Sequence, residues 1–477
     1  MKKSYTDSFF DVGSKFGFLP NNHPLTSLPN RYNSLQRLLD NMPVKLSDGS
    51  NGYLAIPNKI ENEVERLPNY IDLVKKESEI LIIQALYRAY CFLTSAYTLE
   101  LSYQEFVKTK KYGKARQILP KQVAQPFVCV AEKLDVYPWL DYHYAYSLGN
   151  YRFLDKSKGF HWSNLDQCVK FSGTSDESGF IMNHVDINQH SPKLVESVLE
   201  SLKAIKDNDQ EKLNENLKQN FHSMVFVNDR RKDMWVASRW KHYNDFRIFI
   251  MGIKGNNEIF DDGLVYQGVW DEPKQYRGQT GAQDNIIPME DIFSGVINFY
   301  PDNQLTKYLL DLRKYRPKCI QNFFVDLKQD IDSIHGGSIF NFLKSSKNSV
   351  GMCYLLAIVE EIYKFRNGHW QFVQKYIMSN TKYAKATGGT PIISWIPNQI
   401  KSVLNFIEVI LHELQSMDKD FDNKQNEFFI NSLNTYKSKK KLLDKQLIVV
   451  SDANYNPGKV FELNKKFKLE DSNFEKK

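Results

Sequence analysis

The sequence lacks any long uncharged run and any recognisable export signal. Its most apolar segment, residues 81–101, is interrupted by Arg88 and contains Glu100, whereas a helix that crosses a bilayer needs about twenty predominantly apolar residues. The first ten residues, MKKSYTDSFF, carry two lysines but no apolar stretch followed by small residues. We therefore expect a soluble chain in the cytoplasm with no membrane partner.

Cysteine is scarce, and the excess of positive charge is small. The five cysteines form no CxxC pair, and their odd number argues against a disulfide framework, so we expect free thiols. The formal net charge is +7, but the 63 Lys and Arg are mixed with 56 Asp and Glu. Lysine concentrates only in KSKKKLLDKQ and at the C-terminus, which is typical of solvated surface. We expect no nucleic-acid partner.

Short motifs that carry a catalytic mechanism are also missing. The sequence contains no GxxxxGKS or GxxxxGKT, no HExxH, no GxSxG and no tandem CxxC. These absences exclude the usual P-loop, zinc-protease and serine-hydrolase sites.

The sequence is rich in apolar residues at helical spacing. Residues 1–60 are punctuated by Pro, Asn, Gly and Ser, but from there on apolar side chains recur every three or four positions, as in residues 80–90, 194–205, 350–363 and 400–414. Strand-like runs are few and short. The pattern predicts an all-α protein.

Composition divides the chain into three parts. We expect a small helical domain with an irregular start over residues 1–155 and a larger helical domain over residues 156–415. Residues 416–477 are polar and rich in lysine, and we expect them to form an extension that is not part of the core.

Two glycine-rich loops and two side chains could form a binding site. The loops are residues 252–288 and the ATGGTP segment, and loops of this kind are more often functional than idle. His184 lies four residues after Phe180, so the two share a helix face. Arg247 precedes an apolar run and needs a counter-charge if that run is buried; the partner is either a ligand carboxylate or an acid of this chain.

Several stretches together resemble the indoleamine 2,3-dioxygenase family, in the same order along the chain. They are RQILPKQVAQPFVCVAEKL, YPWLDYHYAYSLGNY, GFIMNHVDI, FRIFIMGIKGN, DGLVYQGVWDEPKQYRGQTGAQ, LRKYRPKCIQNFF, HWQFVQKYI and ATGGTP. The resemblance implies a small helical domain capping a large one that holds heme b. It also implies a monomer that adds both atoms of O₂ to the indole ring of tryptophan or a related indoleamine, giving N-formylkynurenine from tryptophan.

The resemblance also assigns expected roles to individual residues. Arg247 matches the arginine that binds the substrate carboxylate, and Thr387 matches a residue that meets the substrate when its loop closes. His184 matches the distal position above the iron. The remaining matches are Phe180 and Tyr142 as aromatic walls of the substrate pocket, and Thr280, Gly281 and Gly388 as small residues close to the heme.

Two departures from the family pattern put the chemistry in question. Alignment on Pro317 places Ile320 where the family has the histidine that binds iron, and isoleucine cannot ligate a metal. The neighbouring Cys319 could substitute only if its helix were rotated, because adjacent helical residues diverge by about 100°. His335 follows the helix in a Gly-Gly turn, and His369 matches a position that is structural in the family, so neither is expected to replace the ligand.

The second departure concerns the indole slot. His242 and Tyr243 replace two aromatic residues of the family, which makes the slot more polar. Three functions remain open: a heme dioxygenase, a non-catalytic member of the fold that binds an indole or amino-acid ligand, and an enzyme with a non-heme metal held by His184, Asp186 and His242.

Overall fold

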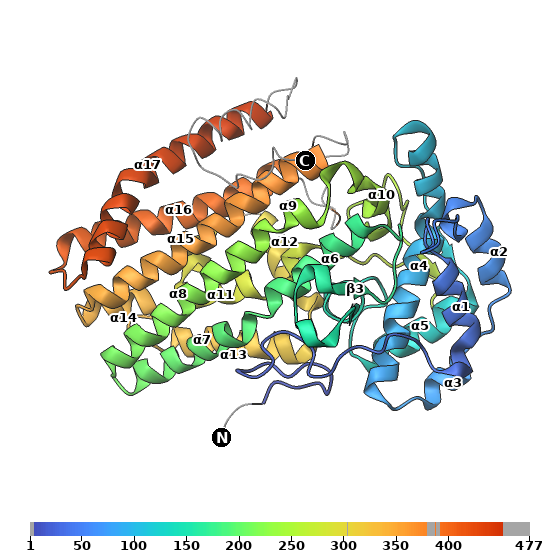
Figure 1. Cartoon of the computed structure of the whole chain (residues 1–477), viewed down its shortest axis with the longest axis horizontal. Coiled ribbons are helices and arrows are strands. Elements are labelled where there is room, and N and C mark those ends of the chain that lie inside the picture. The colour runs from blue at the N-terminus through green and yellow to red at the C-terminus, as the bar shows by residue number, and fades with distance from the viewer. Residues whose placement is uncertain (1–3, 303, 379–386, 388–391, 452–477) are drawn as a thin grey trace.

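The chain folds into helices, as Figure 1 shows, and the prediction of an all-α fold is confirmed. The computed structural model describes residues 4–302, 304–378, 387 and 392–451. Its strands are short and pair two by two: β1 (Ile118–Leu119) runs parallel to β4 (Val265–Tyr266), and β2 (Tyr151–Phe153) runs antiparallel to β3 (Leu165–Gln167). They pin loops to the helices rather than forming a layer of their own.

The N-terminal helices gather at one end of the molecule (Figure 1). They are α1 (Asn33–Asn41), α2 (Lys59–Glu65), α3 (Ile71–Lys76), α4 (Ile80–Thr109) and α5 (Lys121–Lys133). The central member, α4, is long and apolar enough to cross a membrane, but 89% of its most apolar window is buried inside the protein. It is the core helix around which α1, α2 and α5 pack.

The charges within α4 are paired inside this core. Arg88 donates from Nη1 to the carbonyl of Gly149 at 2.7 Å and from Nη2 to the carbonyl of Leu25. Glu100 is fully buried and forms an ion pair with Arg116 at 2.9 Å. Buried charges require such partners, so these residues bind the turn-rich first segment and the loop after α5 to the helix.

The remaining helices form the larger part of the molecule. They are α6 (Ser175–Asn188), α7 (Ser191–Lys206), α8 (Gln210–Lys232), α9 (Met234–Ala237), α10 (Asn244–Arg247), α11 (Ile286–Ser294), α12 (Gln304–Leu312), α13 (Lys318–Asp332), α14 (Ile339–Ser345), α15 (Ser349–Phe372), α16 (Ile392–Ser416) and α17 (Asn423–Ser451). In Figure 1, α8, α15 and α16 run alongside one another, with α15 packed against both of the others.

The C-terminal extension is part of the core, so the expectation that it lies apart was wrong. Helix α17 packs against α16 (Figure 1), and it buries Phe429, Tyr436 and Leu443 in the main hydrophobic cluster. Its polar residues occupy the outer face, which explains why composition alone suggested a detached tail.

The N-terminal segment covers α13. Tyr5 donates its hydroxyl to Asp326 at 2.8 Å, and Phe18 stacks on Phe324 with ring centroids 6.3 Å apart. Cys319 donates its thiol to Asp7 at 3.2 Å. The start of α13 is therefore sealed by the first residues of the chain.

A buried carboxylate on α11 gives the fold a pH-dependent element. Glu290 is fully buried and accepts a hydrogen bond from Asn220 on α8 at 3.0 Å. Burial, with a smaller contribution from Asp291, raises the pKa of Glu290 to about 8. The folded state therefore keeps a proton that the unfolded chain releases near pH 4 to 5.

We predict that Glu290 makes a contribution to the free energy of unfolding that falls as the pH rises from about 5 to 8, and that Glu290→Gln removes this contribution. At this site the folded state binds more protons than the unfolded state in that range, so raising the pH lowers the contribution, by on the order of 1–3 kcal/mol. Urea unfolding at several pH values measures it. Glu132→Gln, at an exposed position on α5, is the control and should leave the slope unchanged; equal slopes in wild type and Glu290→Gln would contradict the prediction.

Candidate functional site

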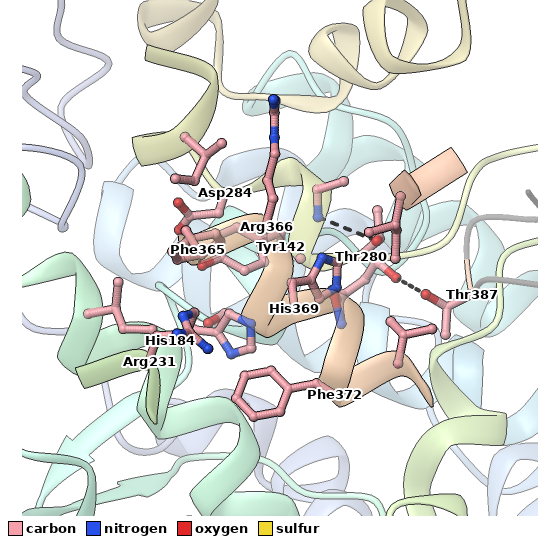
Figure 2. A pocket seen from close by; sticks show the side chains of 18 of the residues that line it. Tyr142, His184, Arg231, Thr280, Asp284, Phe365, Arg366, His369, Phe372 and Thr387 are labelled. Carbon is pink, nitrogen blue, oxygen red and sulfur yellow. Dashed lines mark hydrogen bonds between the residues drawn. The ribbon is translucent and has the colours of Figure 1, made fainter. Parts of the chain in front are cut away.

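A cavity of about 250 Å³ lies among α6, α8, α15 and the loop that precedes α11. It is far larger than a packing defect that holds one or two waters. Figure 2 shows side chains from these elements projecting into it, with Phe365 and Phe372 as apolar walls and His184, Arg231 and His369 as polar groups. Such a mixture is typical of a site for an organic ligand.

The structure brings together six of the residues that the sequence singled out, from four separate regions of the chain. The six that line the cavity are Tyr142, Phe180, His184, Thr280, Gly281 and Thr387. Gly388 lies outside the described residues.

The His184 side chain presents a hydrogen-bond acceptor to the cavity. Its Nδ1 lies 2.9 Å from the carbonyl oxygen of Phe180, one turn earlier on α6. A carbonyl can only accept, so Nδ1 carries the proton and Nε2 holds a lone pair. Burial lowers the pKa of His184, although the Phe180 carbonyl and Asp284 oppose this shift. The imidazole is therefore neutral at pH 7.

Gly281 lies directly against this imidazole. A Cβ atom placed on Gly281 would stand 3.6 Å from His184 Nε2. The preceding residue, Thr280, caps the short helix η8 (Gly281–Gln283) by accepting from the amide of Ala282, and Gln283 returns a bond to the Thr280 amide. This capping box fixes the loop where it meets α6.

Tyr142 ties the N-terminal part of the chain to the cavity. The carboxylate of Asp141 caps the turn η3 (Tyr142–Tyr146) by accepting from three of its backbone amides. Tyr142 then donates its hydroxyl to Asp284 at 2.7 Å, and Asn188 on α6 donates to the same carboxylate at 2.7 Å. Tyr142, α6 and the loop before α11 are thus joined at one carboxylate.

Thr387 is held by the loop that contains Gly252 and Gly278. Its hydroxyl donates to the carbonyl of Gln279 at 2.7 Å, and its carbonyl accepts from the amide of Gly252 at 2.8 Å. A Cβ atom on Gly278 would lie 2.6 Å from the Thr387 carbonyl and would also overlap the Gly252 amide. Because Gly278 has no side chain, the backbone segments at Gly252, Gly278 and Thr387 can approach one another closely.

Arg247 is buried close to the cavity but does not line it. It donates from Nη1 to the Tyr112 hydroxyl at 2.8 Å and interacts with Tyr243, whose ring does line the cavity. His242 does not reach the cavity either, because it is exposed and pairs with Asp245 at 3.0 Å. Of the two residues predicted to make the indole slot more polar, only Tyr243 lines the cavity.

The position expected to face the iron does not face the cavity. Ile320 and Cys319 are both buried, and neither belongs to the cavity wall among the residues that the structure describes. Cys319 is turned toward Asp7, and that carboxylate together with burial raises the pKa of its thiol far above the usual range. A protonated thiol facing away from the cavity cannot serve as a metal ligand, so the suggested substitution by Cys319 was wrong.

A different histidine, His369, lines the cavity, although the sequence analysis assigned it a structural role. On α15 the cavity-facing residues are Phe365, Arg366, His369 and Phe372, a stripe at helical spacing. The signal was available: this stripe places an arginine and a histidine on the buried face of a long apolar helix. The alignment on Pro317 drew attention to α13 instead.

The imidazole of His369 is surrounded by protein atoms, but it has accessible surface, and this surface lines the cavity. Burial lowers its pKa to about 4, and His184, Arg231 and Arg366 contribute to the shift. Within the described part of the chain no hydrogen bond engages its ring nitrogens. The side chain is therefore a neutral imidazole with a free lone pair at the cavity surface.

Positive charge gathers around the same cavity. The arginines on its wall are Arg231, Arg313, Arg316 and Arg366. Arg366 pairs with Asp291 at 2.6 Å and accordingly keeps a raised pKa, whereas burial lowers the pKa of Arg316 to about 9, which still leaves it charged at pH 7. A ligand that carries carboxylates would suit this surplus of cations.

The residues suggested for a non-heme metal are not brought together. Asp186 points away from His184, into a cluster where it accepts from the amide of Trp162 at 2.8 Å and lies 3.6 Å from Arg230. With His242 on the outside, these three side chains share no site, and this alternative was wrong.

We predict that Gly278→Ala lowers the free energy of unfolding by about 1–3 kcal/mol, because the new methyl group overlaps rigid backbone. Gly281→Ala, three residues along the same loop, should change it by less than about 1 kcal/mol, because its methyl group meets His184 at an ordinary contact distance. Chemical denaturation of the two variants gives both values. An equal decrease in the free energy of unfolding in both variants would show that the close backbone contact at Gly278 does not stabilise the loop.

Comparison with known proteins agrees with the geometry. Residues 6–432 match the family model described as indoleamine 2,3-dioxygenase. Indoleamine 2,3-dioxygenase 1 of Rattus norvegicus is 24% identical over 407 residues, which cover 81% of this chain and 92% of the rat protein. The type 2 enzyme of Mus musculus is 25% identical, covering 80% and 86% of the two chains, and that of Homo sapiens is 24% identical, covering 84% and 95%. The chain belongs to the indoleamine 2,3-dioxygenase family.

Proposed function

We propose that this protein is a heme-dependent dioxygenase that opens the indole ring of tryptophan or a related indoleamine, giving N-formylkynurenine from tryptophan. One observation carries the proposal: His184 from α6 and His369 from α15 both line the same cavity (Figure 2). One of these imidazoles could hold a metal-bearing cofactor, and the other could hydrogen-bond the substrate.

The residues present fit heme b. His369 offers the neutral nitrogen that an iron ligand requires, and its side chain is exposed at the cavity wall, whereas that of His184 is only partly exposed. Phe365 and Phe372 would pack against the porphyrin, and Arg313 and Arg316 suit its propionates. When bound, ferrous heme supplies the binding and activation of O₂.

His184 and its neighbours would bind and orient the substrate. The Nε2 atom of His184 accepts a hydrogen bond, so it suits the indole N–H group. Phe180 and Tyr243 lie in contact, with ring centroids 5.0 Å apart and ring planes inclined by 51°, and would form an angled aromatic wall for the indole ring. Tyr142 and Thr387 close the cavity from two other sides, which excludes water from the reacting atoms.

The carboxylate of the substrate would be bound by Arg247. This arginine lies behind Tyr243, so contact with a substrate requires a shift of the Tyr243 ring. The guanidinium of Arg247 is already desolvated, so it could bind a carboxylate through two hydrogen bonds without further desolvation of its own.

The alternative of a non-catalytic binding protein rested on Ile320. Since Ile320 does not face the cavity and a histidine does, that reason no longer applies. No other feature of the described residues favours it over the dioxygenase.

We predict that His369→Ala abolishes stoichiometric heme binding, because it removes the nitrogen that would hold the iron. The test is the absorption spectrum of protein expressed with ample heme, recorded as ferric, reduced and carbon monoxide-bound forms. Wild type should give a Soret band and a stable carbonyl complex, and imidazole added to His369→Gly should restore part of the band. Cys319→Ala is the matched control and should match wild type; loss of heme in this variant with retention in His369→Ala would overturn the assignment.

We predict that His184→Ala retains heme but lowers kcat/KM for tryptophan by about 10- to 100-fold, the loss expected for one hydrogen bond made in a buried site. Formation of N-formylkynurenine, followed by mass spectrometry, measures the rate. His190→Ala changes another half-buried histidine, outside the cavity wall, and serves as the control. Unchanged turnover in His184→Ala would remove His184 from the proposed mechanism.

A further inference from the structure

Helix α15 has a second face, opposite to the one that lines the cavity. Glu360, Tyr363 and Trp370 lie at intervals of three and seven residues, so they share one side of the helix. All three are buried, and each contacts a side chain of α17. The helix that carries His369 is therefore held between the cavity and the C-terminal helix.

Two polar contacts join α17 to α15. Trp370 donates from Nε1 to Gln446 Oε1 at 3.0 Å, and both side chains are almost completely buried. Lys439 forms an ion pair with Glu360 at 2.6 Å and lies over the Tyr363 ring at 5.1 Å. Buried donors and acceptors with defined partners fix orientation as well as position.

These contacts lie outside the part of the chain that the family accounts for. The match to the family model ends at residue 432, whereas Lys439 and Gln446 belong to the following turns of α17. In Figure 1, α17 runs along the outside of the molecule beside α16, at the end of the described chain. The contacts to α15 are thus made by the turns of α17 that follow the family match.

The Trp370 contact falls where α15 needs support. The α-helix ends at Phe372 and continues as the wider helix η11 (Val373–Met378), so His369 lies in the last α-helical turn. The change from α- to π-helical hydrogen bonding is a local irregularity of the helix, and the Val373 amide is shared there between the carbonyls of His369 and Trp370. A buried side-chain anchor on the residue next to His369 fixes the helix at this irregularity.

We infer that α17 braces the last turn of α15, and that Gln446 is a positioning residue which, through Trp370, fixes the orientation of the His369 imidazole. The inference rests on the proposed function in so far as His369 binds iron. Because residues 369 and 370 are joined through one backbone, any rotation of the helix about its axis at Trp370 turns His369 by the same angle.

The test is Gln446→Leu in the full-length protein, which keeps the side-chain size but leaves the Trp370 N–H without its acceptor. In the heme-bound protein we expect the iron–histidine stretching band of the ferrous form to shift or broaden in resonance Raman spectra. Transfer of heme to apomyoglobin should become about three- to tenfold faster. Gln446→Glu retains an acceptor and should restore both values.

A matched control lies one residue from Lys439. Lys440 pairs with Glu408 on α16 at 2.7 Å, so Lys440→Met loosens α17 from α16 without removing a contact to α15. This variant should leave the Raman band and the rate of heme transfer unchanged. Equal changes in Lys440→Met and Gln446→Leu would overturn the inference, because α17 would then act only through general stability. The absence of a change in both variants would also overturn it.

Hydrogen–deuterium exchange separates this inference from the proposed function. In protein without heme, amides of residues 366–372 should exchange faster in Gln446→Leu and in Trp370→Phe than in wild type or Lys440→Met. Absence of heme in wild type with this difference present would refute the iron-binding role of His369 and leave the brace intact. Heme binding in wild type with no difference in exchange would refute the brace alone.

Discussion

The orientation of α15 is the constraint on which the site depends. The helix is enclosed by its neighbours, yet it carries an arginine and a histidine on the face toward the cavity. Arg366 is compensated by Asp291 and the Tyr300 hydroxyl, at 2.6 and 2.7 Å, while His369 avoids the cost of a buried charge by remaining neutral. Turning the helix by one residue, about 100°, would bring Trp370 to the cavity in one sense of rotation and would direct His369 toward α17 in the other, so either rotation removes His369 from the cavity wall.

The site also requires that loops from distant parts of the sequence contact α6 and α15 without separating these two helices. Asp284 achieves this on one side by accepting from both Tyr142 and Asn188. Gly278 achieves it on the other side, where the absence of a side chain lets the loop touch the backbone at Gly252 and Thr387. The cavity is therefore bounded by short, specific polar contacts between elements that apolar packing alone would not hold in register.

Periodicity and glycine content predicted the helices and the two loops, because these signals are local, whereas the resemblance to the family supplied the roles of the six cavity residues. The failures were of another kind. Which of two helices presents its residue to the cavity is decided by packing between distant segments, so an alignment anchored on Pro317 selected Ile320 although His369 lies on the cavity wall. The polar composition of α17 likewise hid Leu443 and Gln446, which only tertiary contacts bury. The domain limits, the cytoplasmic location and the monomeric state stay predictions.

The chemistry of the cavity wall bears on which substrates it can select. Several tyrosines line it, and the hydroxyls of at least two are engaged by the protein: Tyr142 donates to Asp284, and Tyr376 donates to the carbonyl of Ser238 at 2.5 Å. Burial raises the pKa of Tyr243 to about 12 and keeps it protonated beside Arg247. These residues therefore offer ring faces rather than free hydroxyls, and the acceptor at His184 Nε2 stands among apolar surfaces. Such a slot discriminates by flatness and by one N–H group, the two features that an indole ring combines.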